Sequence, residues 1–412
     1  MHYLFIYSSP GILGGIETLI ARMSRWLVRK GNQVTLIANQ VGDWKHLLAK
    51  EVRVLPLGER YAQLYYYFHA GKLATRYDIS APDVIKSFDI PSSWIACQMA
   101  HRFGNRCKVI AGNYNPFVFR DYATAQWPAW EKPSLIMRNF LECIPPSARI
   151  FCGQDQLDEL QAIHQQSALL WPLPMDAGEF LPAVRRPKLG KIVSVGRLSP
   201  MKEYNFYMID VVRELIAKGR AVTWSVYGKG EFEGPMRERI RQYKLEQVIT
   251  LEGEVPYNRF WQVLADASIF VGMGTSLFEA ALFKVPNVTA SPFDREGLTW
   301  GPVYQFPKGS LGPADCAPPH LKVVDEIERI LNLGAAEYRA EAEAVYRHVQ
   351  DHEINASMQR FLAAVQEAEP ATLEPRRYLA NYLCWLFRKA GSKSHTIRQQ
   401  RRLDIPASAG KK

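Results

Sequence analysis

Residues 3–38 read YLFIYSSPGILGGIETLIARMSRWLVRKGNQVTLIA, and this stretch decides the fold class. It opens with a short apolar run that is typical of a buried parallel strand. Apolar residues then recur at helical spacing from Ile16 to Leu27, and Gly31 ends the predicted helix. A second strand is predicted at Gln33–Ala38. A strand, a helix and a strand within about 40 residues form a βαβ unit, which predicts a parallel sheet.

The second half of the chain begins the same pattern again. Lys191–Gly196 is an apolar strand that ends in glycine, and Phe206–Lys218 predicts the helix that follows it. Further strands are predicted at Asp83–Ser87, Lys108–Gly112, Arg149–Cys152, Val222–Tyr227, Val248–Leu251 and Ile269–Gly272, and further helices at Pro235–Tyr243, Phe260–Ala265 and Leu277–Phe283. We therefore expect two doubly wound α/β domains, with ligands held in the cleft that faces the carboxyl ends of the strands.

The length of 412 residues also favours two domains, because one hydrophobic core rarely organises so long a chain. A proline-rich stretch in the middle of the chain is typical of a linker. The predicted boundaries are 1–170 for the N-terminal domain, 171–190 for the linker, 191–350 for the C-terminal domain, and 351–412 for C-terminal helices that return toward the first domain and end in a basic tail.

The net charge of +10 is concentrated in the tail, where residues 370–412 hold ten Lys or Arg and two acidic residues. Basic residues flank an aromatic and aliphatic run there, which favours an interfacial helix at an anionic membrane surface through 376–402. The other interpretation is a final helix that packs on the N-terminal domain. The tail shows no nucleic-acid-binding motif, so we expect no nucleic-acid partner.

The N-terminus, the lengths of the apolar runs and the cysteine spacing exclude several classes of protein. The N-terminus has no signal-peptide pattern, and no apolar run approaches the ~18 residues of a membrane span. The six cysteines form no CxxC pair, which favours reduced thiols in a cytoplasmic protein.

Glycine and cationic residues follow the predicted strands at four places. Gly14 and Gly15 follow the first strand, and glycine allows close backbone approach before a helix start that attracts anions. Arg197 and Lys202 follow the strand Lys191–Gly196, where a guanidinium fork and an ammonium suit a diphosphate. The other two places hold glycine turns and the start of a helix: Gly228, Gly230, Gly272, Gly274, Thr275, Ser276, Leu277 and Glu279.

These residues together resemble the retaining glycosyltransferase family 4, which has the GT-B fold. The resemblance is spread from Gly14 to Val288 and is strongest after Val193. It implies that the N-terminal domain binds the acceptor and that the C-terminal domain binds a nucleotide-sugar. It implies that Arg197 and Lys202 are catalytic residues that clamp the donor diphosphate, and that Glu279 accepts hydrogen bonds from the ribose, as an acceptor-only carboxylate can.

The resemblance assigns the glycines and the helix start to the donor as well. Gly14 and Gly15 would let the backbone approach the donor phosphate, and Gly228 and Gly230 would lie beside the base. The amides near Thr275, Ser276 and Leu277 would face the β-phosphate, and the turn at Gly272 and Gly274 would support them.

The sequence departs from the family pattern at two points. The first glutamate of the Glu-x7-Glu motif would fall on Val271, which cannot hydrogen-bond the transferred sugar. The strand Lys108–Gly112 leads into Asn113 and Asn115 instead of a histidine, and these amides are candidate sugar or acceptor contacts. His101 precedes that strand and is more simply a surface residue.

The expected function is therefore transfer of a sugar from a UDP- or GDP-sugar to a glycan or lipid-linked acceptor, with retention of configuration. Neither Asp-x-Asp nor a His/Asp cluster is present, so we expect no cofactor and no obligatory metal. The process would be bacterial surface polysaccharide, lipopolysaccharide or glycolipid synthesis, in the cytoplasm or at the inner face of its membrane. One alternative is a sugar-nucleotide epimerase, whose acidic and histidine residues are not found. The other is a degenerate GT-B subunit that binds nucleotide or a partner enzyme without turnover, which Val271 and the absent histidine favour.

Overall fold

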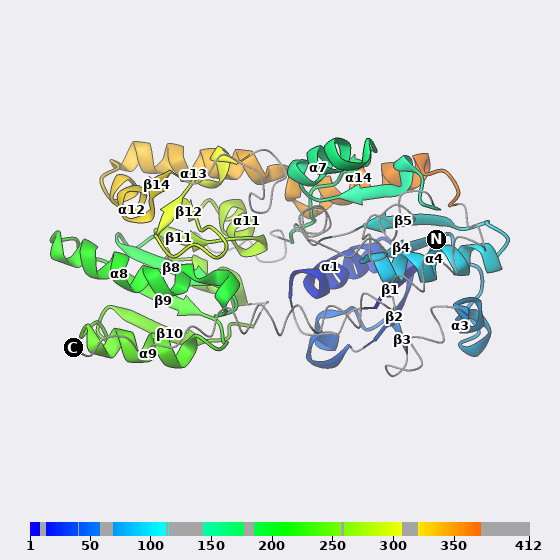
Figure 1. Ribbon diagram of the computed structural model, residues 1–412, viewed down its shortest axis with the longest axis horizontal. Helices are drawn as coiled ribbons and strands as arrows, with labels where there is room; N and C mark the ends of the chain where they lie inside the picture. The colour runs from blue at the N-terminus through cyan, green and yellow to red at the C-terminus, as the bar shows by residue number, and fades with distance from the viewer. Residues whose placement is uncertain are drawn as a thin grey trace, which may run out of the picture.

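The computed structural model describes residues 1–8, 14–39, 41–57, 69–112, 114, 143–176, 185–256, 259–306 and 320–371. These residues form two α/β domains that lie side by side, each built on a parallel sheet with helices around it (Figure 1). The predicted fold class, two doubly wound Rossmann-like domains, is confirmed. The basic tail beyond residue 371 lies outside the described residues.

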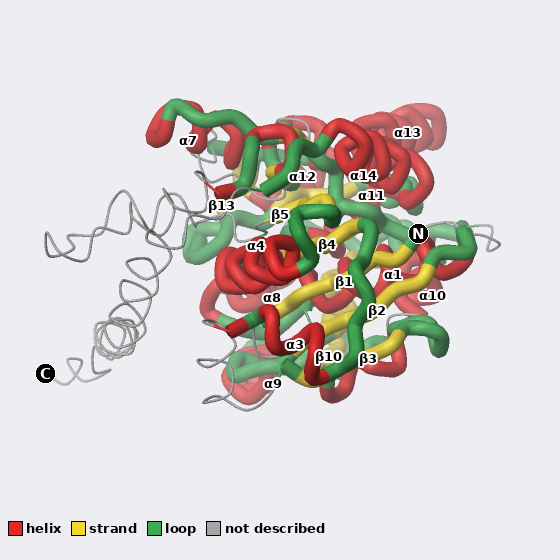
Figure 2. The backbone as a smooth tube through the Cα atoms, turned by 90° about the vertical axis from the view of Figure 1, so that its right-hand side faces the viewer, coloured by secondary structure: helices red, strands yellow, loops and turns green. Residues whose placement is uncertain are grey.

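The first sheet has seven parallel strands in the order β3-β2-β1-β4-β5-β6-β7. Figure 2 shows the strands from β3 to β5 in this order. The strands are β1 (His2–Tyr7), β2 (Gln33–Ala38), β3 (Arg53–Pro56), β4 (Val84–Ser87), β5 (Lys108–Gly112), β6 (Arg149–Phe151) and β7 (Leu169–Leu170). The helices are α1 (Gly15–Arg29), α3 (Gly71–Arg76), α4 (Ile90–Arg102) and α7 (Gln154–His164), with 3-10 turns at Gly42–Leu47 and Pro146–Ala148. The chain order reverses between β1 and β4, and such switch points bind ligands in open parallel sheets.

The second sheet has five parallel strands in the order β10-β9-β8-β11-β12. They are β8 (Lys191–Val195), β9 (Thr223–Tyr227), β10 (Ile249–Gly253), β11 (Ile269–Gly272) and β12 (Asn287–Thr289), and the short strands β13 (Leu298–Thr299) and β14 (Leu321–Lys322) pair separately. The helices are α8 (Tyr204–Ala217), α9 (Glu233–Gln242), α10 (Phe260–Leu264), α11 (Thr275–Leu282), α12 (Val323–Leu331), α13 (Ala335–Val349) and α14 (Ile354–Glu367), with 3-10 turns at Pro200–Lys202, Val303–Gln305 and Gln350–His352. The order of this sheet reverses between β8 and β11.

Two chain segments cross between the domains, and they run together. The segment after β7 carries Met175, whose amide donates to the His352 carbonyl at 2.7 Å in the segment that crosses back. Trp171 Nε1 donates to the Ser357 carbonyl at 2.9 Å at the start of α14. Helix α14 then lies over the first domain (Figure 1), where Lys108 Nζ donates to the Val365 carbonyl at 2.8 Å. The two crossing segments therefore form one paired connection between the domains, which we call the double crossing.

No helix in the described ranges is both long and apolar enough to cross a membrane.

A buried histidine lies in the double crossing. His352 is 2% exposed, its Nδ1 lies 3.1 Å from the Leu173 carbonyl oxygen, and its ring meets Phe278 edge-on at 4.7 Å between ring centroids. Burial lowers the pKa of His352 from 6.5 to about 4. The folded protein therefore keeps a neutral imidazole in the double crossing at pH values where an unfolded chain would protonate it.

We expect acid to weaken the folded state through His352. Above pH 6.5 both states are neutral at this residue, but between pH 6.5 and about 4 only the unfolded state gains the proton. Stability should therefore fall as the pH falls through this window, by about 2 kcal/mol between pH 7 and pH 5 from this group. Urea unfolding of the wild type and of His352→Gln at both pH values checks this. Between pH 7 and pH 5, the free energy of unfolding should fall by about 2 kcal/mol less in the variant than in the wild type. Equal losses in the two proteins would contradict the lowered pKa of His352.

Candidate functional site

The start of α1 meets the start of α11 across the domain boundary. Gly14 precedes α1, and a Cβ added at Gly15 would lie 3.9 Å from Thr275 Cγ2. These residues are 260 positions apart in the chain, and the sequence assigned both to the donor. The structure thus brings the two predicted glycine and helix-start features together at the switch points of both sheets.

Arg197 and Lys202 converge at the end of β8. Lys202 ends the 3-10 turn Pro200–Lys202, and its Nζ lies so close over Gly196 that a Cβ there would overlap it. Burial, and then the charge of Arg197, lower the pKa of Lys202 to about 8. Arg197 itself is exposed. Two cations held together in this way favour an anion between them, because a bound anion relieves their mutual repulsion.

The glycines after β9 hold the end of β8 in place. Gly228 and Gly230 have φ of 151° and 155°, and an added Cβ would overlap the carbonyl oxygens of Gly196 and Leu198 respectively. The Leu198 amide donates to the Lys229 carbonyl at 3.0 Å between these glycines. Only glycine allows backbone to lie this close, so the turn fixes the segment that carries Arg197.

The start of α11 is joined to the same strand. Ser276 Oγ donates to the Val195 carbonyl at 3.0 Å, and the Leu277 amide donates to the Gly274 carbonyl at 3.1 Å. Gly274 has φ of 69°, a conformation that glycine adopts without strain. The Ser276 hydroxyl and the Leu277 amide therefore hold the turn itself. The amides of Thr275 and Ser276 belong to the first turn of the helix, where no intrahelical acceptor is available.

Val271 does not line this site. It lies inside β11, is 0% exposed and packs in the core of the second domain with Ile192 and Val288. Only Met273 and Gly274 connect β11 to α11, so the position eight residues before Glu279 falls within the strand. The valine side chain at this position therefore lies in the core of the second domain.

Glu279 is held from the other domain. Its side chain is 11% exposed, and Arg22 Nη2 of α1 donates to its Oε1. Arg22 is 2% exposed and also donates through Nη1 to the Pro174 carbonyl at 3.2 Å in the double crossing. The apolar spacing of Ile16–Leu27 gives no reason to single out Arg22, so this contact was missed. The one local signal is that Arg22 follows Leu19 by three residues, one helical turn along the buried face.

The first domain contributes a second pair of side chains that the sequence did not single out. Lys86, near the end of β4, is 0% exposed and donates to the Ser87 carbonyl at 2.6 Å. Burial lowers the pKa of its amine well below the ordinary value. A Cβ at Gly112 would approach both Lys86 Nζ and the Tyr114 hydroxyl, which is buried and has no hydrogen-bond partner among the described residues.

The remaining candidates from the sequence lie elsewhere. Asn113 and Asn115 are outside the described residues. His101 is exposed near the end of α4, as expected of a surface residue. In the described ranges, no group of three His, Cys, Asp or Glu side chains is arranged to hold a metal ion.

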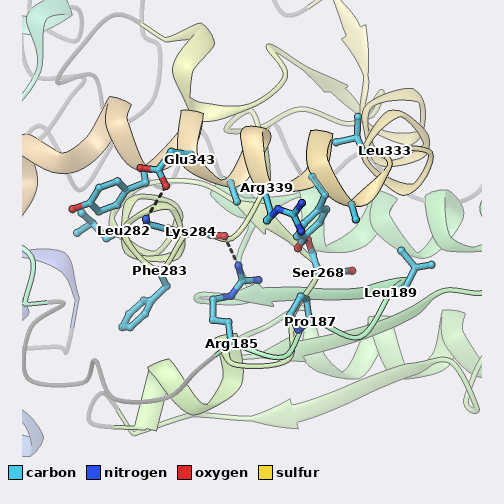
Figure 3. A pocket seen from close by; sticks show the side chains of 14 residues that line it. Arg185, Pro187, Leu189, Ser268, Leu282, Phe283, Lys284, Leu333, Arg339 and Glu343 are labelled. Atoms are coloured by element: carbon cyan, nitrogen blue, oxygen red, sulfur yellow. Dashed lines mark hydrogen bonds and ion pairs between the residues drawn. The ribbon is translucent and has the colours of Figure 1, made fainter.

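A separate cavity of about 890 Å³ lies at the opposite edge of the second sheet (Figure 3). It is bordered by Ser268, directly before β11, by the end of α11 and by α13. Three of its charged side chains bond to the protein: Arg185 donates to the Lys284 carbonyl, and Lys284 Nζ donates to Glu343 at 2.7 Å. The cavity is thus remote from the residues at the carboxyl ends of β8 and β11.

Both halves of the chain match glycosyltransferase family models. Residues 13–172 match the model described as Glycosyltransferase Family 4, and residues 182–294 match Glycosyl transferases group 1. Together the two matches support a GT4-type glycosyltransferase. The matched segments include the loop after β1, the segment with Arg197 and Lys202, and α11.

Curated relatives match this GT4-type chain over part of its length. The proteins named WcaL of Escherichia coli K12 and Salmonella typhimurium, described as glycosyltransferases of colanic acid biosynthesis, are each 31% identical to it over 108 residues. The match covers 26% of this chain and 23% of each relative. The aligned region thus spans about a quarter of the curated relatives.

Solved structures match over most of the chain and show the fold. A lipopolysaccharide outer core galactosyltransferase, WaaB, covers 89% of this chain and 99% of its own, with a TM-score of 0.57 and 14% identity. The Anabaena protein HepE, solved with UDP and glucose, has the same coverage, a TM-score of 0.61 and 15% identity. A glycosyltransferase from Rickettsia africae has a TM-score of 0.62 and 13% identity over 89% of this chain and 98% of its own. At these identities, the comparison supports the GT-B fold alone.

The glycine turn after β9 can be tested directly. Gly228→Ala should lower the free energy of unfolding by roughly 1 to 3 kcal/mol, since the new Cβ overlaps the Gly196 carbonyl and φ is unfavourable. Gly234→Ala is the matched control: it lies in α9, no atom lies within 4 Å of the added Cβ, and alanine favours a helix by roughly 1 kcal/mol. Chemical denaturation of both variants measures the difference, and equal stabilities would contradict the packing described.

Proposed function

We propose that this chain transfers a sugar from a UDP- or GDP-sugar to a glycan or lipid-linked acceptor, with retention of configuration. The observation that carries the proposal is the convergence of Arg197 and Lys202 at the end of β8, beside the first turn of α11. Lys202 is partly buried beside the charge of Arg197, which together lower its pKa, and Ser276 Oγ bonds the turn of α11 to β8. This arrangement suits a diphosphate, which would accept hydrogen bonds from both cations and from the free amides at the helix start.

The other site residues would then contact the remaining groups of the donor and the acceptor. Glu279 would accept a hydrogen bond from the ribose, and the backbone at Gly14 and Gly15 would approach the donor where Gly15 meets Thr275. Gly228 and Gly230 would keep Arg197 in position, with the base beside their turn. On the acceptor side, Asn113, Asn115 and the Lys86–Tyr114 pair are candidates for hydroxyl contacts.

The reaction would depend on the positive charge at the end of β8. As the bond from the anomeric carbon to the diphosphate breaks, negative charge grows on the leaving oxygen, and Arg197 and Lys202 would stabilise it. The acceptor hydroxyl would attack from the same face and pass its proton to a leaving phosphate oxygen. We propose that the two cations provide the electrostatic role without an obligatory metal ion.

The setting we propose is bacterial surface polysaccharide, lipopolysaccharide or glycolipid synthesis at the inner face of the cytoplasmic membrane. The partial match to relatives named for colanic acid biosynthesis supports the pathway class. The basic segment 376–402 would bind anionic lipid and bring the site close to a lipid-linked acceptor.

Nucleotide binding tests this proposal. Thermal shift of the purified chain is measured with UDP, GDP and ADP, in EDTA and again with magnesium, for the wild type and for Arg197→Ala/Lys202→Ala. A ligand at a hundredfold excess over Kd stabilises the native state by about 2.7 kcal/mol. We expect a shift with UDP or GDP that persists in EDTA and is lost in the double variant. No shift with any nucleotide would contradict the proposal and favour a degenerate subunit without turnover.

The lowered pKa of Lys202 predicts how donor affinity depends on pH. Only the protonated amine attracts the diphosphate, so affinity should fall as the pH rises above about 8. Between pH 7 and pH 9 we expect roughly tenfold weaker binding by calorimetry, with proton uptake on binding at the higher pH. Lys202→Arg should abolish this pH dependence because its guanidinium stays charged. A wild type with equal affinity at both pH values would contradict the assignment.

A further inference from the structure

One buried cation joins the two domains at the candidate site. Arg22, on α1 of the first domain, donates to the Pro174 carbonyl in the double crossing and to Glu279 Oε1 on α11 of the second domain. Its side chain is 2% exposed, so both bonds form away from solvent. A guanidinium in such a place fixes the geometry of its partner, because it offers donors in a rigid planar fork.

The position of α1 does not depend on Arg22 alone. One turn further along the helix, Arg25 lies 3.7 Å from Asp176, and Trp26 Nε1 donates to Asn355 Oδ1 at 2.9 Å in α14. These contacts hold the helix against the double crossing and against α14. The bond from Arg22 to Glu279 therefore adds to other contacts that already dock α1. What it affects is the orientation of the Glu279 carboxylate.

We propose that Arg22 is a positioning residue for the donor, which orients the Glu279 carboxylate from across the domain boundary. The inference rests on the proposed function, in which Glu279 binds the ribose. With Oε1 bonded to Arg22, the carboxylate would meet the ribose diol in one fixed direction. Recognition of the ribose would then depend on where the first domain lies, because α1 carries Arg22.

The test is the discrimination between a ribose and a dideoxyribose. Calorimetry measures the Kd of UDP, GDP and their 2′,3′-dideoxy counterparts for the wild type, Arg22→Gln, Arg22→Lys, Glu279→Gln and the double variant Arg22→Gln/Glu279→Gln. Arg25→Gln is the matched control, since it removes a cation one turn away that lies 3.7 Å from Asp176. Dideoxynucleotides keep the base and the diphosphate, so a change in the preference reports the ribose contact alone.

We expect the wild type to prefer the ribonucleotide and Arg22→Gln to lower that preference roughly tenfold, the worth of a charged hydrogen bond. Arg22→Lys should keep an intermediate preference, because a single ammonium offers no fork, and it decides the question if Arg22→Gln does not fold. Arg25→Gln should keep the wild-type preference, and the double variant should match Glu279→Gln.

Two results would overturn the inference, and only the second would also overturn the proposed function. A wild-type preference retained by both Arg22 variants would overturn the positioning role and leave the proposed function intact. A wild type that binds no nucleotide would overturn both.

Discussion

Backbone packs directly on backbone where the strands of the second sheet end, and the candidate site depends on this packing. The carbonyl oxygens of Gly196 and Leu198 occupy the space that side chains at positions 228 and 230 would need. The Ser276 hydroxyl joins the start of α11 to the last residue of β8. These contacts fix the backbone that carries Arg197. Burial, and then the charge of Arg197, lower the pKa of Lys202, and perturbed pKa values of this kind cluster at functional sites.

The first domain completes the site through a few contacts at the boundary. Gly15 lets the start of α1 lie close to Thr275, and Arg22 reaches Glu279 from the next turns of α1. The double crossing holds these parts in register, with neutral His352 buried in its centre. Helix α1 therefore couples the arrangement of the candidate site to the placement of the two domains. A protein built this way would bind its donor with full affinity only when the domains are correctly placed.

Local patterns in the sequence were sufficient for the fold and for much of the site. Helical spacing and apolar runs predicted α1, β1 and β8 to within two residues, because each has its own periodic signal. The cluster of Arg197 and Lys202 was predictable since both follow one strand. Arg22 was not, because its partner is 257 residues away and only the docking of the domains buries it. The role of Val271 stays a prediction, and the structure adds that its side chain is buried in the core of the second domain.

A crystal structure of the full chain with UDP or GDP tests the central claim most directly. The account predicts the diphosphate within hydrogen-bond distance of Arg197, Lys202 and the Thr275 and Ser276 amides, and the ribose on Glu279 while Arg22 still holds that carboxylate. A nucleotide bound instead in the cavity beside Arg185, or a diphosphate that contacts neither cation, would contradict it.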